Sequence, residues 1–160
     1  MAKIRVRAPS ADDAPLILAL IRELAEYERL SHEVLATEDS LREWLFGERP
    51  VAEVVIGEYR GGPAGFALFF HNFSTFLGKP GIYFEDLYVR PEFRGAGVGR
   101  ALLVHIAGLA RERGCGRLEW SVLDWNEPAI GFYKGMGASP VGGWTLYRVR
   151  GKALEELAAR

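Results

Sequence analysis

The segment FRGAGVGRALL, residues 93–103, is the feature that most constrains this chain. In it Gly95, Gly97 and Gly99 alternate directly before an apolar pattern of helical spacing. The first N–H groups of a helix lack partners inside it, and the helix dipole adds partial positive charge there. Bare glycine backbone lets an anion such as a diphosphate reach these groups. The segment therefore predicts either an anion-binding loop or a flexible turn before a helix.

Two other phosphate-binding motifs fit this segment less well. A Walker loop needs Gly-Lys followed by Ser or Thr, which does not occur here. A dinucleotide-binding fold has its first glycine in the turn directly after a strand, and the stretch RPEF intervenes. Glu119 lies at the spacing of that fold's ribose-binding acid, but the chain before the glycines is hairpin-like. Dinucleotide binding stays an alternative, and it predicts affinity for NAD.

Length and composition limit the remaining possibilities. The 160 residues are enough for one domain with a proper core, so we expect a single domain, 1–160. A net charge of -1 disfavours nucleic-acid binding, which normally needs excess Lys and Arg. Cys115 is the single cysteine, and no stretch resembles a signal peptide or a membrane helix. We therefore expect a cytoplasmic protein with no nucleic-acid or membrane partner.

Hydrophobic periodicity predicts an alternation of strands and helices. Ser10 and Asp13 resemble a capping pair before a helix from Leu16 to about Leu30, and Thr37 can cap a second helix. Strands are expected at 3–7, 51–59, 64–73, 81–89, 117–123 and 143–149. Further helices are expected after the glycines, at 126–138 and at 153–160. Hairpin strands combined with helices indicate an α/β or α+β sheet with helices packed on it.

The neighbours of the glycines carry a family resemblance. YVRPEFRGAGVGRALL contains the Arg/Gln-x-x-Gly-x-Gly/Ala pattern and resembles the GNAT superfamily of acetyl-CoA-dependent N-acetyltransferases. IYFEDLYV, LDWNEPAIGFYKGMGA, ATEDSL and IRELAEYERL resemble its diamine acetyltransferase branch, which includes spermidine/spermine and thialysine acetyltransferases. The resemblance implies a mixed, mostly antiparallel seven-strand sheet flanked by helices, with central strands splayed around acetyl-CoA. It also implies a homodimer.

The resemblance assigns residues to the cosubstrate acetyl-CoA. Backbone groups of Leu87 and Val89 are expected to hold its pantetheine arm, and the Leu87 N–H to polarise the thioester carbonyl. Arg94 and Arg100 are expected to add charge at the pyrophosphate. The full expected set is Leu87, Tyr88, Val89, Arg94, Gly95, Ala96, Gly97, Val98, Gly99, Arg100, Asn126 and Lys134.

The same resemblance assigns the proton transfers. Tyr133 matches the tyrosine that the family uses as general acid toward the CoA sulfur; an ordinary Tyr pKa near 10 keeps it protonated at neutral pH. Packing on the sheet is the alternative for Tyr133. Glu85 is the expected base, and Asp86, its neighbour on a strand, points to the opposite face. Asp86 is expected to bind a distal ammonium or to hold a loop, and ordinary hydrogen bonds at a strand end are the alternative for both carboxylates.

Substrate-site residues are expected on two further segments. Tyr27 and Glu28 fall where the diamine branch lines its amine site, and Trp144 matches an aromatic there. Polyamine-acting members carry acids near the positions of Thr75 and Gly142, and this chain has none there. We therefore expect a small primary amine, either a diamine or a lysine-like side chain.

Alternatives of other classes remain open at this point. The acceptor can instead be a protein amine or an aminoglycoside, or the chain can be an acyl-CoA-binding module without turnover. The three histidines are widely separated, so no metal is expected. Cys115 has no His or Asn near it in sequence that suggests a nucleophile.

Overall fold

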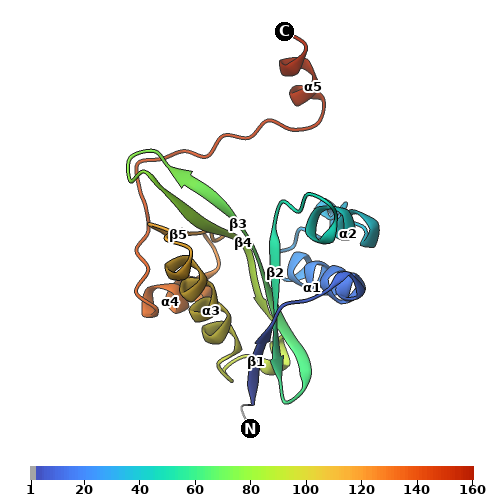
Figure 1. The fold of residues 1–160 in the computed structure, drawn as a ribbon, viewed down its shortest axis with the longest axis vertical. Helices are drawn as coiled ribbons and strands as arrows, with labels where there is room; N and C mark the ends of the chain where they lie inside the picture. The colour runs from blue at the N-terminus through green and yellow to red at the C-terminus, as the bar shows by residue number, and fades with distance from the viewer. Residues whose placement is uncertain (1–2) are drawn as a thin grey trace. The chain divides into compact units, whose positions relative to one another are not determined.

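A computed structural model describes residues 3–160, and their contacts group them into two units. The first unit ends at Ser121, and the second comprises Val122–Arg160. The first unit holds strands β1 (Ile4–Arg7), β2 (Glu53–Tyr59), β3 (Gly62–Ser74), β4 (Lys79–Val89) and β5 (Leu118–Glu119). Its helices are α1 (Ala14–Tyr27), α2 (Glu38–Phe46) and α3 (Val98–Glu112), with short 3-10 turns at Ala11–Asp13, Ser31–Glu33 and Pro91–Phe93 (Figure 1).

The five strands of the first unit form one sheet in the order β1-β2-β3-β4-β5. Neighbouring strands are antiparallel except β4 and β5, which run parallel. Arg60 and Gly61 both have positive φ angles, 50° and 85°, between β2 and β3. That backbone is typical of the tight hairpin turn whose twist matches the strands. The antiparallel pairs from β1 to β4 and the parallel pair of β4 with β5 together make the sheet mixed.

Helices cover both faces of the sheet (Figure 1). Helices α1 and α2 pack on one face around a core cluster that includes Ile17, Leu20, Ile56 and Phe66, all fully buried. Helix α3 lies on the other face. It approaches β2 closely at Gly57, where an added Cβ would lie 2.8 Å from Val98 Cγ1. Sequence periodicity predicted both apolar helix faces, and the structure confirms them.

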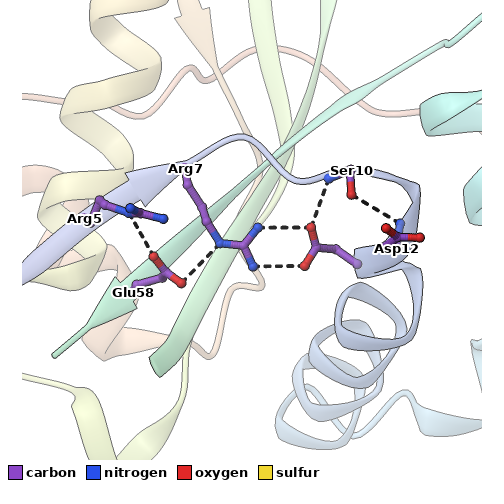
Figure 2. Close-up of polar contacts among 6 residues, drawn as sticks. Arg5, Arg7, Ser10, Asp12 and Glu58 are labelled. Atoms are coloured by element: carbon purple, nitrogen blue, oxygen red, sulfur yellow. Dashed lines mark hydrogen bonds and ion pairs between the residues drawn. The ribbon is translucent and has the colours of Figure 1, made fainter. Parts of the chain in front are cut away.

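An ion-pair network ties the N-terminal strand to the first helix (Figure 2). The Arg7 guanidinium donates two hydrogen bonds to Asp13, at 2.9 and 3.0 Å, and a third to Glu58 at 3.2 Å. Asp13 also accepts from the Ser10 N–H at 2.9 Å, which completes the predicted capping box. The Arg7 hydrogen bonds hold the pKa of Asp13 below its ordinary value of 3.8.

We expect Asp13→Asn to lower the free energy of unfolding by about 1–2 kcal/mol at neutral pH, because it breaks a bidentate charged pair. A lowered pKa in the folded state stabilises the protein above pH 3.8, and that stabilisation is lost as the pH falls through the lowered value. Urea unfolding at neutral and strongly acidic pH measures both effects. Asp12→Asn is the matched control, and equal losses in the two variants would contradict the account.

The second unit contains α4 (Glu127–Gly135) and α5 (Lys152–Ala158). The predicted helix at 126–138 is confirmed, with Asn126 as its N-cap. The strand predicted at 143–149 is wrong, because residues 138–150 form neither helix nor strand. Strand-forming residues need a pleated, half-buried surface, and here Trp144, Leu146 and Tyr147 are all exposed.

The fold class is therefore confirmed as mixed α/β with a mostly antiparallel sheet. The expected strand count was too high: residues 3–160 contain five strands, and the expected strand at 117–123 is reduced to the two residues of β5. No helix among the described residues is long and apolar enough to cross a membrane.

Candidate active site

The glycine loop before α3 has the backbone that an anion site needs. Gly95 and Gly97 have φ angles of +81° and +100°, a region that side chains rarely adopt. The first hydrogen bond of the helix runs from the Ala101 N–H to the Gly97 carbonyl at 3.0 Å. The N–H groups of Val98 and Gly99, which precede Ala101 in the first turn, therefore have no acceptor within the helix. Among the described residues, no atom beyond its chain neighbours lies within 4 Å of a Cβ built on Gly95, so the space beside this backbone is open.

Strand β4 has an open edge over its second half. It pairs with β5 only at Ile82–Leu118 and Tyr83–Glu119 among the described residues. Pairing with β3 skips one residue between Phe84 and Asp86, which makes a β-bulge at Glu85. A bulge leaves one residue out of the ladder and bends its strand. The expected splay between β4 and β5 is therefore present where the bulge occurs.

The bulge also decides which N–H groups face the open edge. Before it, the Ile82 N–H donates to Arg117 on the β5 side at 3.1 Å. After it, the Arg90 N–H donates to the Ala64 carbonyl on the β3 side at 2.8 Å. Because successive residues alternate, the N–H groups of Leu87 and Val89 point to the open edge. These are the two residues expected to hold the pantetheine arm.

Tyr88 lies differently from its two neighbours. By the same alternation its backbone N–H points toward β3, and its side chain is 5% exposed within the core cluster. Burial is the main cause that raises the pKa of Tyr88, with the nearby Glu23 carboxylate second. Tyr88 therefore shapes the site from the core, and its backbone does not face the open edge.

Three carboxylates gather beside the bulge. Asp86 pairs with Leu68, a residue that packs against the α1/α2 core, so its side chain lies on that face of the sheet. Burial, followed by the charges of Glu85 and Glu28, raises the pKa of Asp86 to about 7. Burial also raises the pKa of Glu28, which caps the end of α1. An acidic cluster of this kind suits an ammonium ligand and can also accept a proton near neutral pH.

Arg94 does not point along the glycine loop. Its Nε donates to the Val89 carbonyl at 3.0 Å, and its guanidinium carbon lies 4.8 Å from the centre of the Tyr27 ring. The expected cosubstrate residue and the expected amine-site residue are therefore in direct contact.

The remaining expected residues belong to the second unit. Asn126 caps α4, where its side chain accepts from the Ala129 N–H at 3.4 Å. Tyr133 and Lys134 lie in the last turn of that helix; the Tyr133 ring is partly buried and 5.4 Å from the Phe132 ring. Trp144 is 83% exposed on the extended segment before α5.

Sequence reasoning missed the contacts that hold the fork between β4 and β5. The Trp120 ring stacks on Phe84 with centres 4.6 Å apart, and the Tyr83 hydroxyl lies 2.8 Å from the Ser121 hydroxyl. Both pairs sit directly beside the point where the strands part. The signal that was available is an aromatic residue at neighbouring positions of two predicted strands.

Comparison with known proteins identifies the family. The profile of the Acetyltransferase (GNAT) family matches residues 17–138. The chain belongs to the GNAT acetyltransferase family. This GNAT protein is 39% identical over 171 residues to a thialysine N-epsilon-acetyltransferase of Bos taurus, with 100% of both chains covered. It is 33% identical to an L-ornithine N5-acetyltransferase of Arabidopsis thaliana, covering 96% of this chain and 87% of the relative.

Solved structures share the fold of this chain. A V. cholerae integron cassette protein superposes with a TM-score of 0.83 and 27% identity, covering 100% of both chains. A metagenomic aminoglycoside acetyltransferase superposes with a TM-score of 0.76 over 92% of this chain and 97% of its own; at 16% identity it shows a shared fold alone. The sequence resemblance to GNAT N-acetyltransferases is confirmed, and with it the expectation of an acetyltransferase that uses acetyl-CoA, as members of this family do.

Proposed function

We propose that this GNAT enzyme transfers the acetyl group of acetyl-CoA directly to a primary amine of a small diamine or lysine-like molecule. The observation that carries the proposal is the position of Asp86 and Leu87. The carboxylate of Asp86 lies among acids on one face of β4, and the next residue presents its N–H at the strand's open edge. A cation and a thioester carbonyl can thus be held one residue apart. The full-length similarity to a thialysine acetyltransferase supports the same substrate class.

In this proposal the first unit supplies three functions. The glycine loop and the first turn of α3 hold the pyrophosphate, with Arg100 adding charge. Leu87 and Val89 bind the pantetheine arm through their backbone. The Leu87 N–H also stabilises negative charge on the carbonyl oxygen as the amine attacks. Acetyl-CoA supplies the activated acetyl group; the new N–C bond forms as the C–S bond breaks.

Protons move through two side chains. We assign the proton of the substrate ammonium to Asp86 in place of Glu85, the sequence expectation, because a base works best with a pKa near the working pH. Glu85 and Glu28 then keep the pKa of Asp86 high and attract the cation. We assign proton donation to the leaving sulfur to Tyr133, and contacts to the cosubstrate to Asn126 and Lys134. These second-unit roles rest on the family pattern.

The test is the initial rate of acetyl-CoA consumption with a panel of amines. The panel contains thialysine, lysine, ornithine, short diamines, spermine, an aminoglycoside and a short peptide. We expect the highest kcat/KM with the lysine-like amines and diamines. A long polycation needs additional carboxylates to bind it, and positions 75 and 142 carry Thr and Gly in place of acidic residues. A preference for spermine, the aminoglycoside or the peptide would contradict the proposed substrate class.

Trp144 is proposed to contact the amine, and Trp144→Ala should then raise the amine KM.

We also propose a homodimer. The segment before α5 exposes three large apolar side chains, Val141 at 70%, Leu146 at 79% and Tyr147 at 88%, and a second copy of the chain can cover them. Sedimentation should therefore give twice the mass of the chain, and Leu146→Lys should shift it toward the monomer. A monomeric wild-type protein would refute the proposal.

We further propose that residues 1–160 act as one domain in the cytoplasm. The family match runs across the boundary between the two units, and the free thiol of Cys115 suits a reducing compartment. Cell fractionation that recovered the protein outside the cytosol would contradict this location.

A further inference from the structure

Arg94 joins two sites that the sequence treated separately. Its place beside the glycines predicted a contact with pyrophosphate, and Tyr27 was expected at the amine site. In the structure the guanidinium carbon of Arg94 lies 4.8 Å from the centre of the Tyr27 ring and 5.8 Å from that of Tyr88. Its Nε donates to the Val89 carbonyl at 3.0 Å, which fixes the plane of the group. A guanidinium above an aromatic face is attracted by the ring quadrupole.

A second arginine, Arg90, contacts α1 one helical turn before Tyr27. Arg90 donates to both carboxylate oxygens of Glu23, at 2.9 Å from Nη2 and 3.0 Å from Nε. Its Nη1 donates to the Pro63 carbonyl at 3.1 Å, so Arg90 is itself anchored to the sheet. Glu23 and Tyr27 are four residues apart and therefore lie on one face of α1. Arg90 and Arg94, four residues apart, thus contact Glu23 and Tyr27, which are also four residues apart. Arg90 pairs with Glu23, and Arg94 with Tyr27.

The end of α1 needs such support. The helix stops at Tyr27, and Arg29 takes a φ of +60°, where glycine is the usual residue. The Leu30 N–H donates to the Ala25 carbonyl at 2.8 Å and closes this cap. A residue held in the left-handed region costs about 1 kcal/mol or more, and it persists where neighbouring contacts fix it. Glu28, whose charge acts on Asp86, lies between Tyr27 and this strained residue.

We propose that Arg94 is a positioning residue for the amine site. By lying over the rings of both Tyr27 and Tyr88, it fixes the last turn of α1 and so places Glu28 beside Asp86. Loss of Arg94 should then weaken binding of the amine. Loss of a residue that binds the pyrophosphate would instead weaken binding of acetyl-CoA. The inference rests on the proposed function, because it assumes that the acidic cluster binds the amine.

The test separates the two substrates. In Arg94→Met the KM for the preferred amine should rise about five- to tenfold, the range expected when a contact of this strength is lost. The KM for acetyl-CoA should stay within about twofold. Arg94→Lys keeps the cation but not the planar stacking or the Nε donor, so it should recover part of the loss. Arg100, in the first turn of α3, is the matched arginine, and in Arg100→Met the KM for acetyl-CoA should rise instead.

A double-mutant cycle tests the contact itself. Tyr27→Leu should raise the amine KM, and adding Arg94→Met should raise it little further, because both changes remove one interaction. In Tyr27→Phe, which keeps the ring, Arg94→Met should retain its full effect. Fully multiplicative effects of Arg94→Met and Tyr27→Leu would overturn the proposal, as would a rise in the acetyl-CoA KM with an unchanged amine KM.

Calorimetry distinguishes failure of this inference from failure of the proposed function. The dissociation constant of the amine is measured with CoA bound, a complex that cannot react. We expect Arg94→Met to weaken amine binding about five- to tenfold and to leave CoA binding unchanged. If the wild-type protein binds neither CoA nor any amine, the proposed function fails. If it binds both and Arg94→Met leaves the amine constant unchanged, the positioning role alone is refuted.

Discussion

Tyr133→Phe is expected to lower kcat about a hundredfold or more while acetyl-CoA binding stays within about twofold. The substitution removes the hydroxyl proton and keeps the ring, so the packing against Phe132 is preserved. Without a donor the sulfur must leave as a thiolate, and general acid catalysis of such a step is worth about 10²–10⁴ in rate. Steady-state kinetics with the preferred amine give kcat, and calorimetry gives the affinity for CoA.

A matched control makes this result specific to the hydroxyl. Phe132→Leu changes the neighbouring ring of the same helix and should affect kcat far less than Tyr133→Phe. A kcat for Tyr133→Phe equal to that of the wild type would remove Tyr133 from the mechanism. A parallel loss of CoA affinity would instead assign it a binding role.

Asp86→Asn is expected to lower kcat/KM about a hundredfold and to abolish the acidic limb of its pH profile, the fall of kcat/KM toward low pH. In the wild type the base must be deprotonated, so kcat/KM should fall as the pH drops through the Asp86 pKa of about 7. Asparagine cannot take the proton, so the variant should show no limb in that range. The measurement is kcat/KM across the pH range with acetyl-CoA saturating.

Glu85→Gln separates the two neighbouring carboxylates. The Glu85 charge is one cause of the raised pKa of Asp86, so its removal should lower that pKa and move the acidic limb to lower pH. Above the limb, the rate should stay within about tenfold of the wild type. If Glu85→Gln abolishes the limb and Asp86→Asn merely shifts it, Glu85 is the base.

Local patterns in the sequence predicted much of the first unit. The alternating glycines before an apolar helix predicted an unusual backbone conformation at Gly95 and Gly97. Both residues have positive φ angles, which glycine adopts far more readily than other residues. The capping pairs at Ser10 and Thr37 were equally local and are both present. Such features depend on a few consecutive residues, and a sequence shows them directly.

Features that depend on pairing between distant segments were not predictable from pattern. The bulge at Glu85 is set by the register of β3 against β4, and it reverses which residues face the open edge. The orientation of Arg94 depends on Tyr27, 67 residues earlier in the chain. The segment 143–149 has strand-forming residues, yet it forms no strand because its side chains are exposed rather than packed on a sheet.

Mass spectrometry of the acceptor after incubation with acetyl-CoA tests the central claim most directly. The protein is mixed with acetyl-CoA and equal amounts of thialysine, ornithine and a short diamine, and the products are compared with those of Asp86→Asn. We predict one added acetyl group on an amine nitrogen, formed with an equal amount of free CoA and strongly reduced in the variant. Free CoA without an acetylated amine, or no reaction despite CoA binding, would contradict the assignment as a small-amine acetyltransferase.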